Sequence, residues 1–214
     1  MSITVRKYKK RDFKQWDEFV KHSNNGTLFH LRKFLGYHPD DRFIDNSLIF
    51  EKKEKIISIF PGALKEKDGK ISLISHPGAS MGSCVVPENI TLYDALELTE
   101  QLVSYASKNG IHRLQITLPP IIYNKRFSQY LDFAYQKSGF NYQKREVASM
   151  LFLENTIEKC LDKFKSNHRT AVRKAEKSGI QIRQSEDFAS FFSILAKNLS
   201  IRHNVKPAHT LEEM

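Results

Sequence analysis

The sequence predicts a mixed α/β fold, in which amphipathic helices cover a sheet of parallel and antiparallel strands. Segments with the two-residue alternation typical of strands are interleaved with segments whose apolar residues recur at helical spacing. The order helix, Lys-(Asn/Ser)-Gly, strand occurs three times, at 108–110, 137–139 and 177–179, and glycine readily ends a helix in the left-handed conformation. Apolar residues make up 40% and charged residues 27%, which favours a globular chain over a disordered, collagen-like or coiled-coil one.

The predicted elements follow one another through the first 153 residues. In order they are a strand at 3–8, helices at 12–23 and 31–37, strands at 47–52, 55–64 and 70–75, a helix at 91–109, a strand at 112–118, a helix at 126–138 and one or two strands within 141–153. Asp68-Gly69 is typical of a hairpin turn. Thr91, with Asp94 three residues later, favours a capped helix start.

Residues 149–214 predict the beginning of a second, similar unit. After the strand that ends at 153 come helices at 157–164 and 166–179, a strand at 180–185 and a helix from Asp187. These are too few strands to close an independent core. We therefore expect 1–148 to form a first domain, and 149–214 to be the incomplete start of a second one that continues beyond Met214.

The charge and the cysteine content limit which partners and which compartment are expected. The formal net charge is +10 and the pI is about 9.5, which predicts an anionic partner such as a phosphate, a nucleotide, a nucleic acid or a membrane surface. Two cysteines are too few for a disulfide scaffold. The N-terminus lacks an apolar signal region, and no segment approaches the roughly 18 apolar residues of a membrane helix. A cytoplasmic protein without a transmembrane segment is expected.

A stripe of cations follows one side of the predicted helix at 166–179. Four members recur at four-residue spacing and one lysine lies beside them: Lys165, Arg169, Arg173, Lys174 and Lys177. Ala171, Val172 and Ala175 lie on the opposite side. Because arginine can bind phosphate through two hydrogen bonds, the stripe predicts a phosphate-binding surface; the alternative is a solvated charged face.

The loop at 76–82, HPGASMG, formally contains the pattern G-x-S-x-G. A serine nucleophile of that type needs a helix directly after it, and the sequence SCVVP does not predict one. A tight turn with exposed backbone N–H groups is the better interpretation. It makes His76, Ser80 and Gly82 candidate substrate contacts, and the alternative is a turn without a ligand.

Three further residues are candidate contacts. Arg32 and Lys33 could meet an anionic acceptor between the two halves. Tyr123, after Pro119-Pro120, is either a cleft aromatic or a core residue. The eight histidines form neither H-E-x-x-H nor a close metal pair, so no metal site is predicted.

Three stretches of the sequence resemble a known family. SNHRTAVRKAEKSGIQIRQS is similar to the basic helix R-x-x-x-R-K-A-x-K-x-G and following strand of the FemAB-like branch of the GNAT acyltransferases. GTLFHLRKFLGYHPDDRF and SHPGASMG also resemble FemAB-type proteins. The resemblance implies two tandem GNAT-like halves, of which this chain would hold the first and the start of the second.

The same resemblance implies an N-acyltransferase. Such proteins move an acetyl or aminoacyl group from acyl-CoA or aminoacyl-tRNA to an amine of a cell-envelope sugar or peptidoglycan precursor, with no tightly bound cofactor. The implied partners are an anionic small-molecule or lipid-linked sugar substrate and, for a charged-tRNA donor, tRNA. The family's pyrophosphate loop, Q/R-x-x-G-x-G/A, is not visible, so we expect the donor site beyond Met214 and no acyl-CoA activity from these 214 residues alone. No catalytic residue is assigned. The alternative is a non-catalytic basic module that binds a phosphorylated sugar or RNA.

Overall fold

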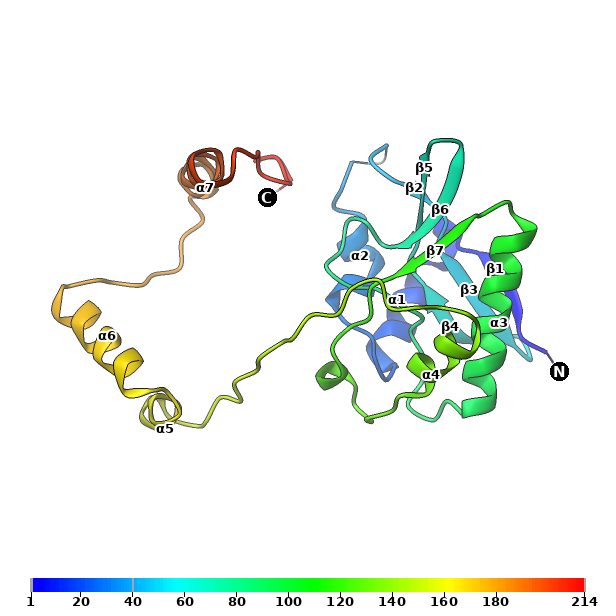
Figure 1. Ribbon diagram of the computed structural model, residues 1–214, viewed down its shortest axis with the longest axis horizontal. Helices are drawn as coiled ribbons and strands as arrows, with labels where there is room; N and C mark the ends of the chain where they lie inside the picture. Colours follow the sequence, from blue (N-terminus) through cyan, green and yellow to red (C-terminus); the bar gives the residue numbers. More distant parts are fainter. Residues whose placement is uncertain (1, 40, 214) are drawn as a thin grey trace. The chain divides into compact units, whose positions relative to one another are not determined.

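The computed structural model describes residues 2–39 and 41–213 and divides the chain into two units, Met1–Glu146 and Val147–Met214 (Figure 1). The first unit contains all the strands of the described chain. In chain order its elements are β1 (Thr4–Lys7), α1 (Phe13–His22), α2 (Arg32–Leu35), β2 (Ile44–Asp45), β3 (Leu48–Lys52), β4 (Lys55–Phe60), β5 (Ala63–Lys67), β6 (Lys70–Ser75), α3 (Leu92–Lys108), β7 (Arg113–Ile116) and α4 (Tyr130–Lys137). Short 3₁₀ turns lie at Lys10–Asp12, Leu28–His30 and Ile121–Tyr123.

The strands form two sheets, with the orders β1-β3-β4 and β2-β5-β6-β7. All pairs are antiparallel except β6 and β7, which are parallel, and β7 ends the larger sheet. The single strand predicted at 55–64 is wrong, because it divides at Pro61-Gly62 into β4 and β5. Proline has no N–H for a strand ladder. The Gly62 N–H donates instead to Ser47 Oγ, at 3.0 Å.

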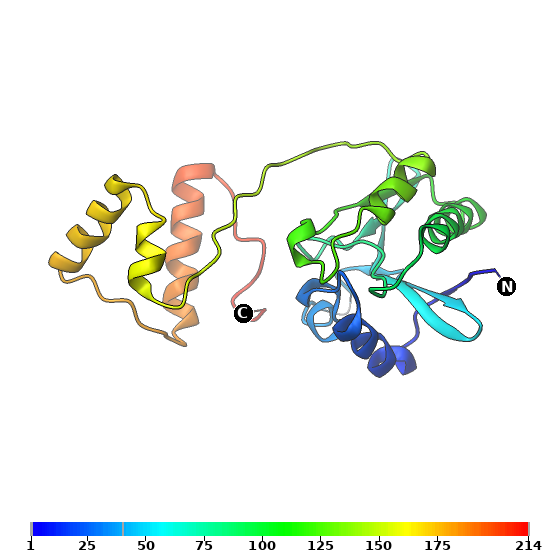
Figure 2. The same cartoon turned by 90° about the horizontal axis from the view of Figure 1, so that it is seen from below.

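The core lies on both faces of the strands, which the period-two alternation of side chains explains. Ile49 and Ile59 pack with Trp16 of α1 on one face. Leu48 and the buried side chains of α3 and α4 pack on the other face. Figure 2 shows α1 and α2 on one side of the strands and α3 and α4 on the other.

Helix α3 begins where the sequence predicts. The side chain of Thr91 accepts a hydrogen bond from the backbone N–H of Asp94 at 3.0 Å. Helix α4 begins at Tyr130 and not at 126. The backbone of Arg126 is already committed, since its N–H and its carbonyl both bond to the side chain of Asn24. The predicted start at 126 is therefore wrong.

The second unit contains α5 (Ile157–Asp162), α6 (Ser166–Lys177) and α7 (Phe188–His203). Its described part has no fully buried residue. The division before Val147 lies two residues ahead of the predicted domain boundary. That this unit begins a second GNAT-like half stays a prediction.

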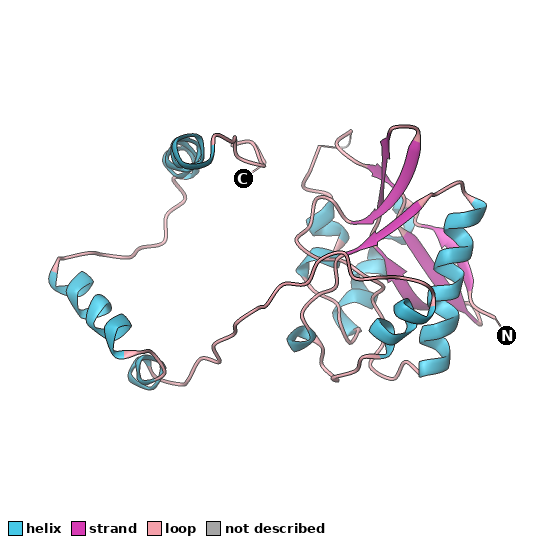
Figure 3. Cartoon of the chain, viewed as in Figure 1, coloured by secondary structure: helices cyan, strands magenta, loops and turns pink. Residues whose placement is uncertain are grey.

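The strands predicted within 141–153 and at 180–185 are absent from the described structure, and these stretches run as loops (Figure 3). A strand needs a neighbour for its backbone N–H and C=O groups, and no described strand pairs with either segment. The side chains of Val147 and Ile182 are each 98% exposed. Both strand predictions are therefore wrong for this structure.

Among the described residues, no helix combines the length and the apolarity that crossing a bilayer requires.

Candidate functional site

The candidate site lies at the carboxyl ends of β6 and β7, the one parallel pair of the described strands. Ligands of α/β proteins commonly bind at such strand ends. The loop at 76–82 starts there and returns between them: Gly82 N–H donates to the Thr117 carbonyl at 2.8 Å, and Ser75 Oγ donates to the Gly82 carbonyl at 3.2 Å. A Cβ at position 82 would lie 3.1 Å from the Ser75 carbonyl oxygen, so a residue without a side chain suits this close approach.

His76 opens the loop and is buried. Its Nδ1 accepts a hydrogen bond from the Gly78 N–H at 3.2 Å. Burial lowers the pKa of His76 to about 4, with smaller and opposing contributions from Asp45 and Arg32. The imidazole is therefore neutral at pH 7.

Phe43 and His38 support the same loop. The Phe43 ring meets the rings of His76 and His38 edge-on, with centroids 5.1 and 5.0 Å apart. His38 Nε2 donates to the Gly78 carbonyl at 3.1 Å. A Cβ at Gly78 would lie only 2.4 Å from that Nε2. Glycine at 78 is thus required for the close approach of His38.

Arg32, predicted to meet an anion, is buried itself and lies in an ion pair with Asp45, whose side chain is 43% exposed. Its guanidinium is 3.6 Å above the centre of the Tyr8 ring and 4.4 Å above that of Trp16. Its Nη1 donates to Asp45 Oδ2 at 2.8 Å. Burial alone would raise the pKa of the Asp45 carboxyl, but the charge of Arg32 and the hydrogen bonds from Ser47 lower it overall. A negative charge therefore already balances Arg32.

Asp17 positions the start of α2. Its carboxylate accepts from the backbone N–H of Arg32 at 2.6 Å and of Lys33 at 3.4 Å. A carboxylate at a helix N-terminus satisfies N–H groups that have no partner within the helix. The side chain of Lys33 is exposed.

The structure brings Arg32 and His76 together near one acid, Asp45, although 44 positions separate them in the sequence. Ser80 is exposed on the loop and Gly82 is buried within it. Tyr123 lies on the 3₁₀ turn Ile121–Tyr123 and is 54% exposed, so the core alternative for it is wrong. Any role of these residues in binding stays a prediction.

The stripe of cations belongs to α6 in the second unit. Arg169 is half-buried, and its Nη1 donates to the Phe164 carbonyl at 2.7 Å and to the Asp162 carbonyl at 3.5 Å. Arg169 therefore caps the end of α5 and ties it to α6. The other four members are exposed: Lys165, Arg173, Lys174 and Lys177. A phosphate-binding role for the stripe stays a prediction.

The sequence reasoning missed Asp45, His38 and Phe43. They come from YHPDDRFID, a stretch rich in aromatic and charged residues that follows α2. It has neither helical nor strand periodicity, and the density of polar and aromatic residues in the loop that leads into β2 was the available signal.

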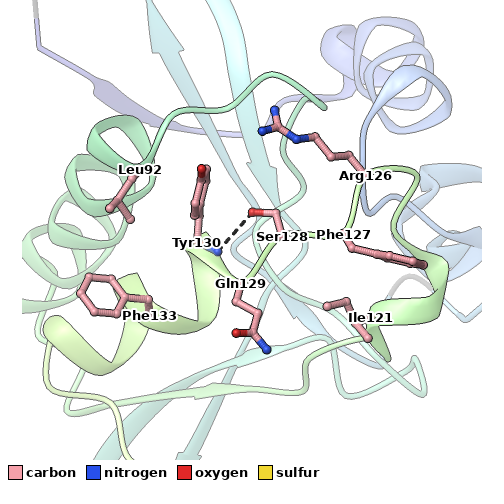
Figure 4. Close-up of a pocket in the computed structure, with 8 residues that line it drawn as sticks. All are labelled: Leu92, Ile121, Arg126, Phe127, Ser128, Gln129, Tyr130 and Phe133. Carbon is pink, nitrogen blue, oxygen red and sulfur yellow. Dashed lines mark hydrogen bonds between the residues drawn. The ribbon is translucent and has the colours of Figure 1, made fainter.

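A second feature is an open pocket of about 590 Å³ beside the start of α4 (Figure 4). Apolar and aromatic side chains of α3, of the Ile121–Tyr123 turn, of the segment before α4 and of α4 line it together with three polar residues. The lining residues are Leu92, Ile121, Phe127, Tyr130, Phe133, Arg126, Ser128 and Gln129. The Arg126 guanidinium reaches the Glu88 carbonyl at 3.4 Å. No sequence pattern pointed to this pocket.

No protein-family model matches the chain, and no curated protein matches it. Among solved structures it is similar to FemX, with a TM-score of 0.64 and 15% identity over 98% of this chain. The fold is similar to that of about half of FemX. This confirms the predicted mixed α/β fold of the GNAT and Fem type. The alignment covers 52% of the FemX chain, so the present chain spans about half of that protein.

Two acetyltransferase structures also align. They are the ribosomal-protein-alanine N-acetyltransferase of Brucella melitensis biovar Abortus 2308 (TM-score 0.46, 10% identity) and a GNAT family acetyltransferase of Staphylococcus aureus subsp. aureus USA300_TCH1516 (TM-score 0.42, 12% identity). Each alignment covers 71% of this chain and 100% of the other chain.

Proposed function

We propose that this chain is part of an N-acyltransferase of the FemAB-like type, which transfers an acetyl or aminoacyl group to an amine of a cell-envelope sugar or peptidoglycan precursor. The observation that carries the proposal is the similarity to FemX over 98% of the chain. The resemblance of the basic helix at 166–179 to the FemAB-like pattern supports it independently.

The reaction is a direct attack of the acceptor amine on the carbonyl of a thioester or ester donor. The amine loses a proton, the C–N bond forms, and the thiol of CoA or the hydroxyl of tRNA leaves with a proton. Such catalysis depends on holding both partners in line and on stabilising the oxyanion. The loop at 76–82 supports this proposal because rigid contacts hold it at the ends of two parallel strands.

The test uses the protein that contains this chain, expressed from its complete reading frame. Labelled acetyl-CoA and labelled aminoacyl-tRNA are offered separately with an amino sugar and with a nucleotide-linked muramoyl peptide as acceptors, and the products are identified by mass spectrometry. The proposal expects a new amide on one acceptor from one donor. Absence of transfer from both donors to both acceptors, by a folded protein, would contradict it.

The alternative is a non-catalytic module that binds a phosphorylated sugar or RNA. The exposed cations of α6 favour it, because exposed lysines and arginines attract phosphates without any chemistry. Salt-dependent binding of tRNA or a nucleotide-sugar without turnover would support this alternative.

A further inference from the structure

His76 carries its ring proton on a defined nitrogen. Since Nδ1 accepts from the Gly78 N–H, the neutral ring holds its proton on Nε2. The described residues supply no acceptor for that Nε2–H. Three donor atoms of the described chain are fully enclosed without a partner, His30 Nε2, Arg32 Nε and Asn46 Nδ2, and His76 Nε2 is not one of them. The Nε2–H of a buried ring is therefore left reachable from outside.

The ring is also held in one orientation. Phe43 packs edge-on against the His76 ring. The Gly78 N–H donates to this ring, and the Gly78 carbonyl accepts from His38. A donor that is held in place loses little freedom when a ligand binds. Because this N–H is reachable from outside and has no acceptor among the described residues, a ligand oxygen can accept from it.

The charges around the ring select the kind of oxygen. The imidazole is neutral at pH 7, and Arg32, the guanidinium whose charge acts on the ring, is paired with Asp45. His38, the other titratable group facing His76, already donates to the Gly78 carbonyl. Because the positive charge of Arg32 is balanced, this group of polar side chains is suited to an uncharged acceptor and not to a phosphate.

We propose that the Nε2–H of His76 binds an uncharged amide carbonyl oxygen of the acceptor substrate, in an acetamido group or a peptide bond. This rests on the proposed function, because it names the part of the acceptor that the loop at 76–82 recognises. His76 is a binding residue in this proposal and does not take the proton of the attacking amine.

The experiment observes the imidazole nitrogens of the 214-residue chain by ¹H–¹⁵N NMR at pH 7, with the His76 signals assigned from variants. The probes are N-acetylglucosamine and N-acetylalanine methylamide, with glucose and inorganic phosphate as comparisons. The proposal expects a protonated Nε2 that shifts with at least one amide probe and less with glucose and phosphate. A proton on Nδ1, a charged ring, a response to phosphate alone, or no response to either amide probe would overturn it.

Two variants separate the effect of losing the Nε2–H donor from the effect of losing the hydrogen bond that supports the loop. His76→Asn keeps an oxygen that can accept from the Gly78 N–H, but its shorter side chain places no N–H at the position of Nε2, and it should weaken amide binding about tenfold. His76→Gln keeps an N–H donor near the position of Nε2 and should retain most of the affinity. Equal losses in both variants would count against the donor role.

His112 provides the matched control. Its Nδ1 also accepts a backbone N–H, from Ile71 at 3.2 Å, but its side chain is exposed. His112→Asn should leave amide binding unchanged. Because these measurements report binding and not transfer, a protein that binds amides without acylating an amine contradicts only the proposed function. Transfer without any response of His76 contradicts only this inference.

Discussion

The two units of the chain differ in how their apolar side chains are used. In the first unit, Phe50 and Phe60 are completely buried. In the second unit, Phe191 is 52% and Ile194 is 69% exposed, both on α7. Apolar side chains that are exposed together on one helix are normally covered by other protein, so the second unit presents a surface that needs covering.

The second unit nevertheless forms helices, and its predicted strands are absent. Helices α5 and α7 each begin with a local cap. The Thr156 side chain accepts from the Lys159 N–H, and the Asp187 side chain accepts from the Ser190 N–H. The hydrogen bonds of a helix lie within one segment, whereas those of a strand need another one. The comparison shows which structure local sequence specifies and which requires distant partners.

The test with the largest expected effect replaces one phenylalanine in each unit. Phe50→Ala should lower the free energy of unfolding of the first unit by about 3–5 kcal/mol, because it leaves a cavity in a closed core. Phe191→Ala should change the free energy of unfolding of the second unit by about 0.5 kcal/mol or less. Urea denaturation of both variants measures the difference, and similar losses would contradict the contrast between the units.

Acid should also act on the first unit. Burial lowers the pKa of His30 and of His76 to about 4. The unfolded chain binds these protons first, so the stabilisation is complete above pH 6.5 and is lost as the pH falls toward 4. By pH 5 the loss should be on the order of 2 kcal/mol for each histidine.

Denaturation midpoints at pH 7.5, 6 and 5 measure this loss. His76→Gln, which cannot titrate in this range, should make the pH dependence shallower, whereas His112→Asn provides the exposed control. An equal dependence of stability on pH for wild type and His76→Gln would contradict the lowered pKa of His76.

A smaller effect is expected at Gly78. Gly78→Ala places a Cβ 2.4 Å from His38 Nε2 and 2.7 Å from Phe43 Cε2, which should cost about 1–3 kcal/mol. The exposed loop residue gives a matched control, since Ser80→Ala should be neutral. Thermal unfolding compares the two variants, and a neutral Gly78→Ala would show that the packing around the loop adjusts freely.

The smallest effects distinguish two arginines of α6. Arg169→Ala removes the hydrogen bonds that tie α5 to α6, and should destabilise that pair by about 1 kcal/mol. Arg173→Ala removes an exposed charge and should change stability by about 0–0.5 kcal/mol. Circular dichroism follows the helices during denaturation. If the stripe binds phosphate, Arg173→Ala should weaken tRNA binding and reduce its salt dependence.

The features that the sequence could predict were those set by neighbouring residues. Asp68 and Gly69 adopt positive φ in the β5–β6 turn, and Gly110, Gly139 and Gly179 do so after their helices. These confirm the predicted hairpin and the three predicted helix ends. The division at Pro61 could also have been predicted, because proline interrupts a strand ladder.

The candidate site was less accessible to prediction. The sequence singled out Arg32 and His76 separately, but it could not indicate that Asp45 lies near both. That proximity depends on how β2 and β6 are placed in one sheet, which is a consequence of the whole fold. The ion pair also changed the interpretation of Arg32, since its charge is used within the protein.

The position of β7 at the end of its sheet has a consequence for amide exchange with solvent. Peptide groups of β7 that face β6 are bonded to it, whereas those on the other side face no strand of the described chain. Deuterium should therefore enter this short strand unevenly, quickly at the N–H groups that point outward and slowly at those that point toward β6. A segment that adds to this edge would slow the fast set and leave the slow set as it is, so the exchange pattern of four residues reports whether the sheet has gained a strand.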